Sequence, residues 1–141
     1  GAGSLRSPLP TLRVGGCREA LADMRGPIIH VANLLTEGAG MNGFTAGDAI
    51  ERLNTAIGRP VDMVIVNVEA PPDSVLERYG REQKHPLPLG RIPDGCELIE
   101  GGFWKGAIAR HDRRRLRAAV WASLVRLMDR RAAPRRAKAR A

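Results

Sequence analysis

The sequence predicts an α/β fold built on a parallel sheet with crossover helices. Two short runs, 27–34 (PIIHVANL) and 61–68 (VDMVIVNV), are rich in β-branched apolar residues, which is typical of strands buried on both faces. A helical pattern lies between them. A strand, a helix and a strand within about 40 residues indicate a right-handed βαβ crossover.

The helix between these two strands carries start and stop signals. Its apolar residues recur at spacings of four, three and four (Ala46, Ile50, Leu53 and Ile57). Thr45 and Asp48 form the S/T-x-x-D/E signature of a capping box, so the helix should begin at 44–45. Gly58, followed by Pro60, should end it.

Four further elements complete the pattern. A short helix over 17–24 (CREALADM) precedes the first strand, and 71–80 (PPDSVLERYG) forms another helix with Pro72 near its first turn. A third strand is expected over 95–101 (GCELIEG). The last helix, 111–129, has an apolar face made by Leu116, Val120, Leu124 and Leu127.

The net charge of +8 is concentrated at the C-terminal end. Residues 110–141 hold eleven arginines and one lysine against two aspartates, whereas the first 109 residues hold 11 basic and 13 acidic residues. We divide the chain into a domain over 1–129 and a disordered basic tail over 130–141, because the tail lacks large apolar residues and contains Pro134. Aromatic residues are only 4%, so nucleic-acid binding is not expected as the main function.

Composition places the protein among globular cytoplasmic proteins. The chain has 141 residues, 43% of them hydrophobic, which suits one domain. It has no run of about 18 apolar residues, so no membrane insertion is expected, and no signal peptide is visible. Cys17 and Cys96 lack the spacing of a zinc site and are expected to be reduced thiols.

A glycine-rich loop over 38–43 follows the first strand and spells G-x-G-x-x-G. In a dinucleotide site the last glycine lies inside the first helical turn, but here Thr45 caps the helix two residues after Gly43. Glu69 matches the ribose-binding acid only loosely. The dinucleotide reading is therefore weak. The loop still lies at the carboxyl end of a strand, where open α/β sheets bind ligands.

A second glycine cluster opens the chain as Gly1, Gly3 and Ser4. Glycines leave backbone N–H groups accessible, and such groups together with the serine hydroxyl suit a phosphate. A short Gly-Ser leader left by cloning is the alternative interpretation.

The two clusters together resemble the gluconeogenesis factor family, the bacterial branch of a superfamily that includes 2-phospho-L-lactate transferase. The segment GAGSLRSPLPTLRVGGCREAL is similar to the family's G-P-G-S-L-x-T-S-x-L-P-N-L-L-V-x-G-I-x-E-A-L. VANLLTEGAGMNGFTAGDAIERL resembles its N-L-M-T-Q-P-G-E-T-x-G-F-T-x-x-D-H segment. VDMVIVNVEAPPDSVLERYGREQKHPL and RHDRRRLRAAV are similar to the segments that follow.

The resemblance implies a Rossmann-like domain that binds a nucleotide-linked small molecule, in this branch a UDP-sugar. Members of this branch regulate carbon metabolism and cell-wall synthesis or cell shape, so we do not expect an enzyme. The alternative is a phospholactyl transferase with a guanosine-linked donor and magnesium. Residue by residue, Gly1, Gly3 and Ser4 match the phosphate-binding motif. Asn33, Thr36, Thr45 and Asp48 match the ligand-binding strand end and helix start.

This chain departs from the family pattern in the loop. It lacks the loop proline and second acid, and Ala49 replaces the histidine after the aspartate. His30 and His111 are expected to be structural. No residues correspond to the family's first-strand glycine loop, so the chain resembles the C-terminal part of a longer domain. An unpaired strand edge would then favour a homo-oligomer.

Overall fold

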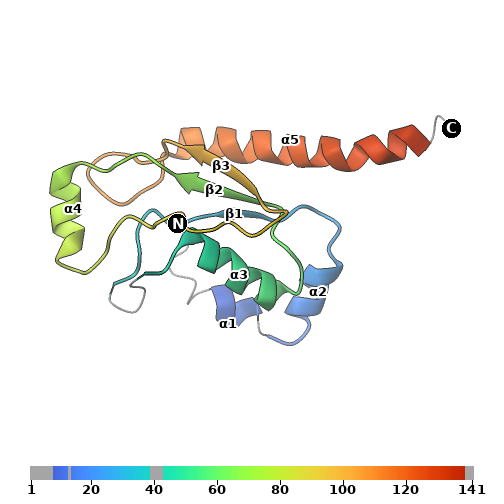
Figure 1. Cartoon of the computed structure of the whole chain (residues 1–141), viewed down its shortest axis with the longest axis horizontal. Helices are drawn as coiled ribbons and strands as arrows, with labels where there is room; N and C mark the ends of the chain where they lie inside the picture. The colour runs from blue at the N-terminus through green and yellow to red at the C-terminus, as the bar shows by residue number, and fades with distance from the viewer. Residues whose placement is uncertain (1–7, 13, 39–42, 139–141) are drawn as a thin grey trace.

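The computed structural model describes residues 8–12, 14–38 and 43–138, and they form three layers (Figure 1). The middle layer is a parallel sheet of order β1-β2-β3, with β1 at Ile29–Val31, β2 at Met63–Asn67 and β3 at Glu97–Gly101. One face carries α1 (Pro8–Leu12), α2 (Cys17–Asp23) and α3 (Ala46–Ile57), and the other carries α5 (Arg113–Lys138). α4 (Asp73–Gly80) lies beyond the carboxyl ends of the strands (Figure 1). The predicted α/β fold with a parallel sheet is confirmed.

The core follows from the alternation of side chains along the central strand. In β2, Val64 and Val66 point toward α3 and join its apolar face in one buried cluster. Met63 and Ile65 point to the opposite face, which α5 covers, and both are almost fully buried. Both faces are thus apolar, which explains the unbroken apolar run in the sequence.

The strands are shorter than predicted. β1 has three residues, whereas the apolar pattern covered 27–34, because the chain leaves the sheet after Ala32. Leu34 and Leu35 instead form a separate buried cluster with Val75 and Trp104. The apolar run therefore predicted correctly that 27–34 is largely buried, but it could not distinguish strand residues from a buried connection.

An extended segment, His85–Arg91, lies across the connection between β1 and α3, and we call it the strap. At its start it pairs with the chain after β1, since Leu87 N donates to Leu34 O at 3.1 Å. Further along, the amides of Ala46 and Gly47 donate to the carbonyls of Pro88 and Leu89, at 2.8 and 3.0 Å. Leu87 and Leu89 pack against the core under α3. The strap thus joins the end of β1 to the start of α3.

The last helix extends further than the sequence predicted. We expected a disordered tail over 130–141, but α5 continues to Lys138; within that tail, 139–141 lie outside the described residues. Apart from Pro134, the residues from 130 to 138 are arginine, alanine and lysine, which are strong helix formers. Arg130 also pairs with Glu97, and Arg131 with Asp62 at 2.6 Å, which fixes the helix to the body.

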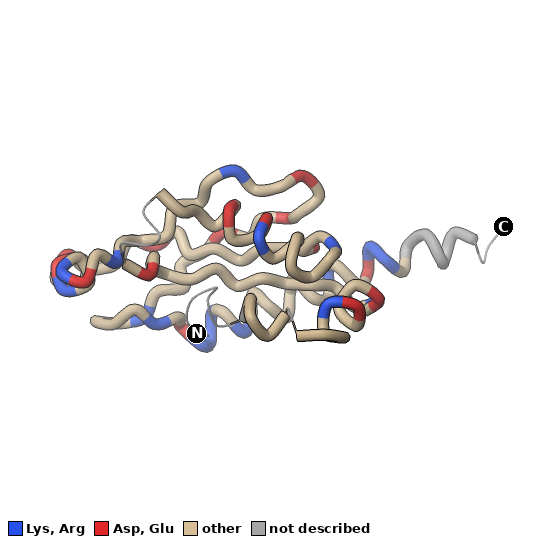
Figure 2. Tube along the Cα trace, turned by 90° about the horizontal axis from the view of Figure 1, so that it is seen from below, with Lys and Arg blue, Asp and Glu red and all other residues tan. Residues whose placement is uncertain are grey.

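Charged residues are interspersed over the described body of the molecule rather than gathered on one folded face (Figure 2). Even with its 26 residues, α5 is too polar to cross a bilayer, and no other helix in the described ranges meets that requirement either. The free thiols Cys17 and Cys96 are both partly buried.

The close approach of the strap to α3 yields a prediction about Gly47. A Cβ atom on Gly47 would lie 2.0 Å from the carbonyl oxygen of Arg91, which is backbone and cannot rotate away. We expect Gly47→Ala to displace the strap and to lower the free energy of unfolding by roughly 2–3 kcal/mol. Urea denaturation measures this change.

Gly80→Ala is the matched control, because Gly80 also lies in a helix and its Cβ would meet nothing within 4 Å. That variant should be neutral or slightly more stable. Equal stability of the two variants would contradict the strap contact.

Candidate functional site

The carboxyl ends of the three parallel strands meet at one edge of the sheet, which makes this edge the candidate site. Two asparagines lie there with different roles. The side chain of Asn67 is bonded at both ends of its amide, because its Oδ1 accepts from Phe103 N at 2.7 Å and its Nδ2 donates to Glu69 O at 2.8 Å. Asn33, beyond β1, is half-buried and has no side-chain hydrogen bond within the described part of the chain. Among the described residues, therefore, no group competes with a ligand for this amide.

Thr36 is a buried residue tied to the strap. Its hydroxyl accepts from His85 N at 3.0 Å, and its own amide donates to His85 O at 2.7 Å. Only 8% of Thr36 is exposed. The two bonds to the strap are enough to explain why a polar residue stands at this buried position.

Thr45 and Asp48 form the predicted capping box at the start of α3. Thr45 Oγ1 accepts from Asp48 N at 3.1 Å, and Asp48 Oδ2 accepts from Thr45 N at 2.8 Å. The Thr45 hydroxyl also donates to Asp48 Oδ2 at 2.7 Å. These bonds, the hydroxyl first, hold the pKa of Asp48 below its usual range. Both side chains therefore stabilise the helix start.

The first-turn amides of α3 are all used within the chain. Ala46 and Gly47 donate to the strap, and Asp48 donates to the Thr45 hydroxyl. A helix start usually leaves such donors open to an anion. Here the strap occupies them, so the helix start contributes its dipole but no free N–H group to the site.

The glycine loop is described only at its ends. Gly38 and Gly43 have φ values of 81° and 74°, which favour glycine, whereas 39–42 lie outside the described residues. Gly43 precedes α3 and lies outside its first turn, unlike the last glycine of a dinucleotide fingerprint. Gly1, Gly3 and Ser4 also lie outside the described residues.

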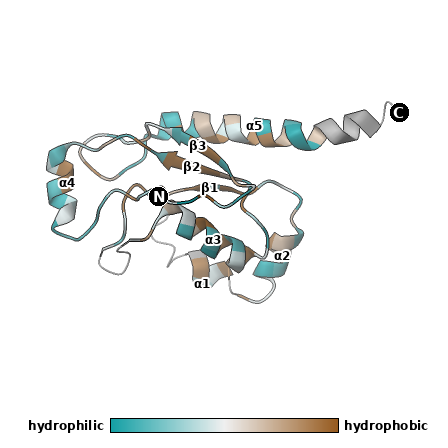
Figure 3. Ribbon diagram, in the orientation of Figure 1, coloured by the Kyte–Doolittle hydropathy of each residue, from teal (hydrophilic) through white to brown (hydrophobic). Residues whose placement is uncertain are grey.

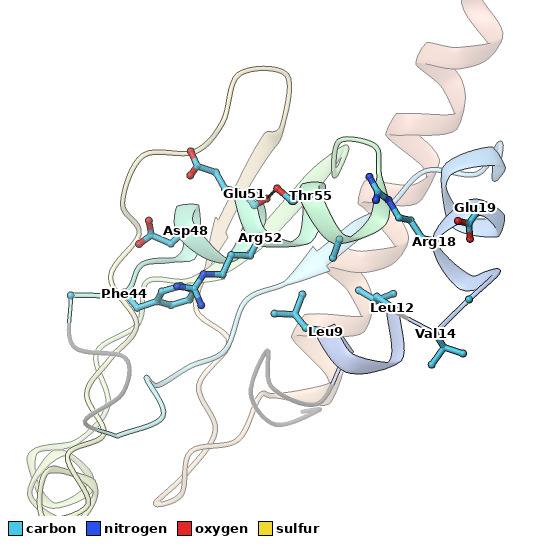
Figure 4. Close-up of a pocket in the computed structure, with 13 residues that line it drawn as sticks. Leu9, Leu12, Val14, Arg18, Glu19, Phe44, Asp48, Glu51, Arg52 and Thr55 are labelled. Carbon is cyan, nitrogen blue, oxygen red and sulfur yellow. Dashed lines mark hydrogen bonds between the residues drawn. The ribbon is translucent and has the colours of Figure 1, made fainter.

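A groove of about 960 Å³ runs along the outer face of α3, between this helix, α1 and the start of α2 (Figure 4). Leu9 and Leu12 of α1 give it an apolar side. Across from them, the Arg52 guanidinium lies 4.7 Å from the centre of the Phe44 ring, in a cation–π contact. Asp48 lies at the end of the groove near the start of α3. The sequence did not reveal this groove, because α1 was not predicted as a helix.

His30 and His111 are both partly buried. Burial lowers the pKa of His30, in β1, to about 4, so this side chain is neutral at pH 7. Burial also lowers the pKa of His111, which hydrogen-bonds to the backbone of Ala32. Among the described residues, neither histidine contacts the glycine loop, where it could act as an acid or a base. Among the described residues, no three His, Cys, Asp or Glu side chains gather to form a cation site.

Comparison with known proteins places these features in a family. The family model for 2-phospho-L-lactate transferase CofD matches residues 1–104. A gluconeogenesis factor of Halalkalibacterium halodurans is 32% identical over 89 residues, which cover 62% of this chain and 28% of that protein. A gluconeogenesis factor of Bacillus subtilis is 29% identical over 120 residues, covering 79% of this chain and 38% of that protein.

Solved structures agree with the fold. A crystal structure of a UPF0052 family member from Bacillus halodurans superposes with a TM-score of 0.69 at 24% identity, covering 80% of this chain and 38% of that one. A second X-ray structure of the same Bacillus halodurans protein gives a TM-score of 0.73 at 26% identity, covering 86% of this chain and 41% of that one. The chain thus spans less than half the length of these proteins.

The capping box yields a prediction about pH. The pKa of Asp48 is lower in the folded than in the unfolded state, so its carboxylate contributes to the free energy of unfolding. This contribution is fully present above the unfolded pKa and is lost as pH falls through the folded pKa. Asp48→Ala should therefore cost about 1 kcal/mol of unfolding free energy at neutral pH. This difference from wild type should shrink below about pH 4.

Unfolding by urea at pH 7 and near pH 3 tests this. Glu51→Ala is the control, since Glu51 lies on the same helix and its side chain accepts no hydrogen bond in the described ranges. A cost for Asp48→Ala that stays constant with pH would show that the carboxylate does not cap the helix.

Proposed function

Because this chain belongs to the 2-phospho-L-lactate transferase CofD family, we propose that it supplies part of a binding site for a nucleotide-linked ligand, and that this ligand is a UDP-sugar. On this proposal the protein is a cytoplasmic regulator of carbon metabolism and cell shape rather than an enzyme. The observation that carries it is the family match over residues 1–104, which includes both glycine clusters. The gluconeogenesis factors among its relatives favour the regulatory branch.

The proposed site lies at the carboxyl edge of the sheet. The Asn33 amide has no partner there among the described residues, and an amide can hydrogen-bond both to sugar hydroxyls and to a nucleobase. Gly1, Gly3 and Ser4 would hold the diphosphate through their backbone N–H groups and hydroxyl. Because the strap already uses the first amides of α3, the diphosphate needs another source of donors, and this glycine cluster can supply it.

Thr36, Thr45 and Asp48 then have a supporting role in the proposed site. Their side chains bond to the strap and to each other, so they hold the two ends of the glycine loop in place. A loop fixed at both ends loses less conformational freedom when a ligand binds. Substituting any of these three residues should therefore weaken ligand binding because the loop becomes less ordered, and not because a contact to the ligand is lost.

A transferase of the phospholactyl type is the second candidate, and the name of the matching family model favours it. Such an enzyme would use magnesium. No set of carboxylate ligands for this ion gathers among the residues that the structure describes, so we assign it no residues here. The two candidates differ in outcome, because a regulator binds its ligand unchanged, whereas a transferase consumes a guanosine-linked donor.

Isothermal titration of the complete protein with UDP-sugars tests the proposal. Asn33→Ala should weaken binding at least about tenfold, equivalent to 1.4 kcal/mol, with little change in unfolding, because its side chain makes no hydrogen bond to the described residues. Gly3→Val should abolish binding by covering the amides. Asn67→Ala is the matched control: it should lose stability, because Phe103 N loses its acceptor, and keep more of its affinity than Asn33→Ala.

An unchanged affinity for UDP-sugars in Asn33→Ala and Gly3→Val would contradict the proposed site. Turnover of a guanosine-linked phospholactate donor, without binding of UDP-sugars, would instead establish the transferase.

A further inference from the structure

The start of α5 brings basic side chains to the carboxyl edge of the sheet. In Figure 1 the first turn of α5 lies beside the arrowheads of β2 and β3, and Figure 3 shows this turn as hydrophilic. His111, just before the helix, hydrogen-bonds to the backbone of Ala32, the residue that precedes Asn33. The segment that leads into α5 therefore borders the proposed site, from the face of the sheet opposite to α3.

Arg115 is held at this edge by two contacts to the strand ends. Its Nη1 donates to the carbonyl oxygen of Gly102, the residue after β3, at 3.1 Å. The same nitrogen lies 3.4 Å from Oε2 of Glu69, two residues after β2. Gly102 leaves room for both side chains, because a Cβ there would lie 3.0 Å from Oε2 of Glu69 and 3.4 Å from Nη1 of Arg115. The guanidinium is thus fixed between the ends of two neighbouring strands.

The remaining donors of Arg115 suit a phosphate. A guanidinium carries five N–H groups in a planar fork, and among the described residues no acceptor competes for those on Nε and Nη2. Such a fork binds phosphate oxygens through two parallel hydrogen bonds. The other basic side chains between 105 and 117 make no hydrogen bond to the described residues. Among them, therefore, Arg115 is the cation that the strand ends hold in place.

We propose that Arg115 binds the diphosphate of the nucleotide-linked ligand. This inference rests on the proposed function, but it holds for a uridine-linked and a guanosine-linked ligand alike, because it concerns the phosphates and not the base or the sugar. A diphosphate carries several negative charges, and a cluster of glycine amides supplies donors without a full countercharge. Arg115 supplies that charge from the opposite face of the sheet.

The contacts already made at the start of α5 leave this role to the side chain. Oδ1 of Asp112 accepts from the amides of Arg114 and Arg115, at 2.8 and 3.1 Å, so the chain itself uses these two donors. The pair between Arg115 and Glu69 does not block a phosphate, because both side chains are exposed, at 59% and 42%, and exposed ion pairs contribute little to stability. A doubly bonded phosphate therefore competes well with the Glu69 carboxylate for the guanidinium.

Isothermal titration of the complete protein with UDP-sugars, UDP and GDP tests this role. Arg115→Gln removes the charge and should weaken binding of whichever nucleoside diphosphate wild type binds, at least about tenfold. Arg115→Lys keeps the charge but not the fork, so its affinity should fall between the two. Arg117→Gln is the matched control, because Arg117 is also exposed on α5 and makes no hydrogen bond to the described residues. It should bind like wild type.

Salt and heat provide readouts that separate a phosphate contact from a structural role. The loss of affinity in Arg115→Gln should be smaller at about 1 M than at about 0.1 M salt, because screening weakens the contact that only wild type makes. The melting temperature of Arg115→Gln should stay close to that of wild type, because the side chain is 59% exposed.

The outcomes distinguish this inference from the proposed function. A wild type that binds none of these ligands would overturn both. If wild type binds and Arg115→Gln binds equally well, or loses no more affinity than Arg117→Gln, only the role of Arg115 is wrong. An Arg115→Gln variant that loses affinity together with melting temperature would show that the arginine supports the fold, and this too would overturn the inference.

Discussion

The strap over the start of α3 is the constraint on which the site depends. It bonds to Thr36 at one end of the glycine loop and to Ala46 and Gly47 at the other. The strap can lie this close to α3 only because Gly47 has no side chain. The strap thereby fixes the described ends of the glycine loop, and it supplies acceptors for amides that would otherwise need water or a ligand.

The strap bears on two roles that the sequence analysis gave to the same residues, capping of α3 and ligand binding. Thr45 and Asp48 were predicted as both cap and ligand residues, and the structure confirms the cap. With the first-turn amides in use, a bound diphosphate would feel the helix dipole but find no free N–H group there. On the proposed function, recognition by polar side chains at the strand ends then matters more, and Asn33 is the residue that we propose for it.

The sequence predicted the crossover unit and the ends of α3 well because these depend on local signals: apolar spacing, a capping box, and Gly58 in the left-handed conformation. It did not predict the strap, although Leu87 and Leu89 alternate with prolines in the way of an extended segment. The role of the strap depends on residues about 40 positions away, which no local pattern encodes. The same is true of the last turns of α5, where Arg131 bonds to Asp62.

Hydrogen exchange of the complete protein, with and without UDP-sugar, tests whether the strap occupies the start of α3. The amides of Ala46 and Gly47 should be protected without ligand, because the Pro88 and Leu89 carbonyls already bind them. Added ligand should then increase protection mainly around Asn33 and the glycine clusters. Fast exchange at Ala46 and Gly47 in the free protein, with protection appearing only when ligand binds, would contradict it.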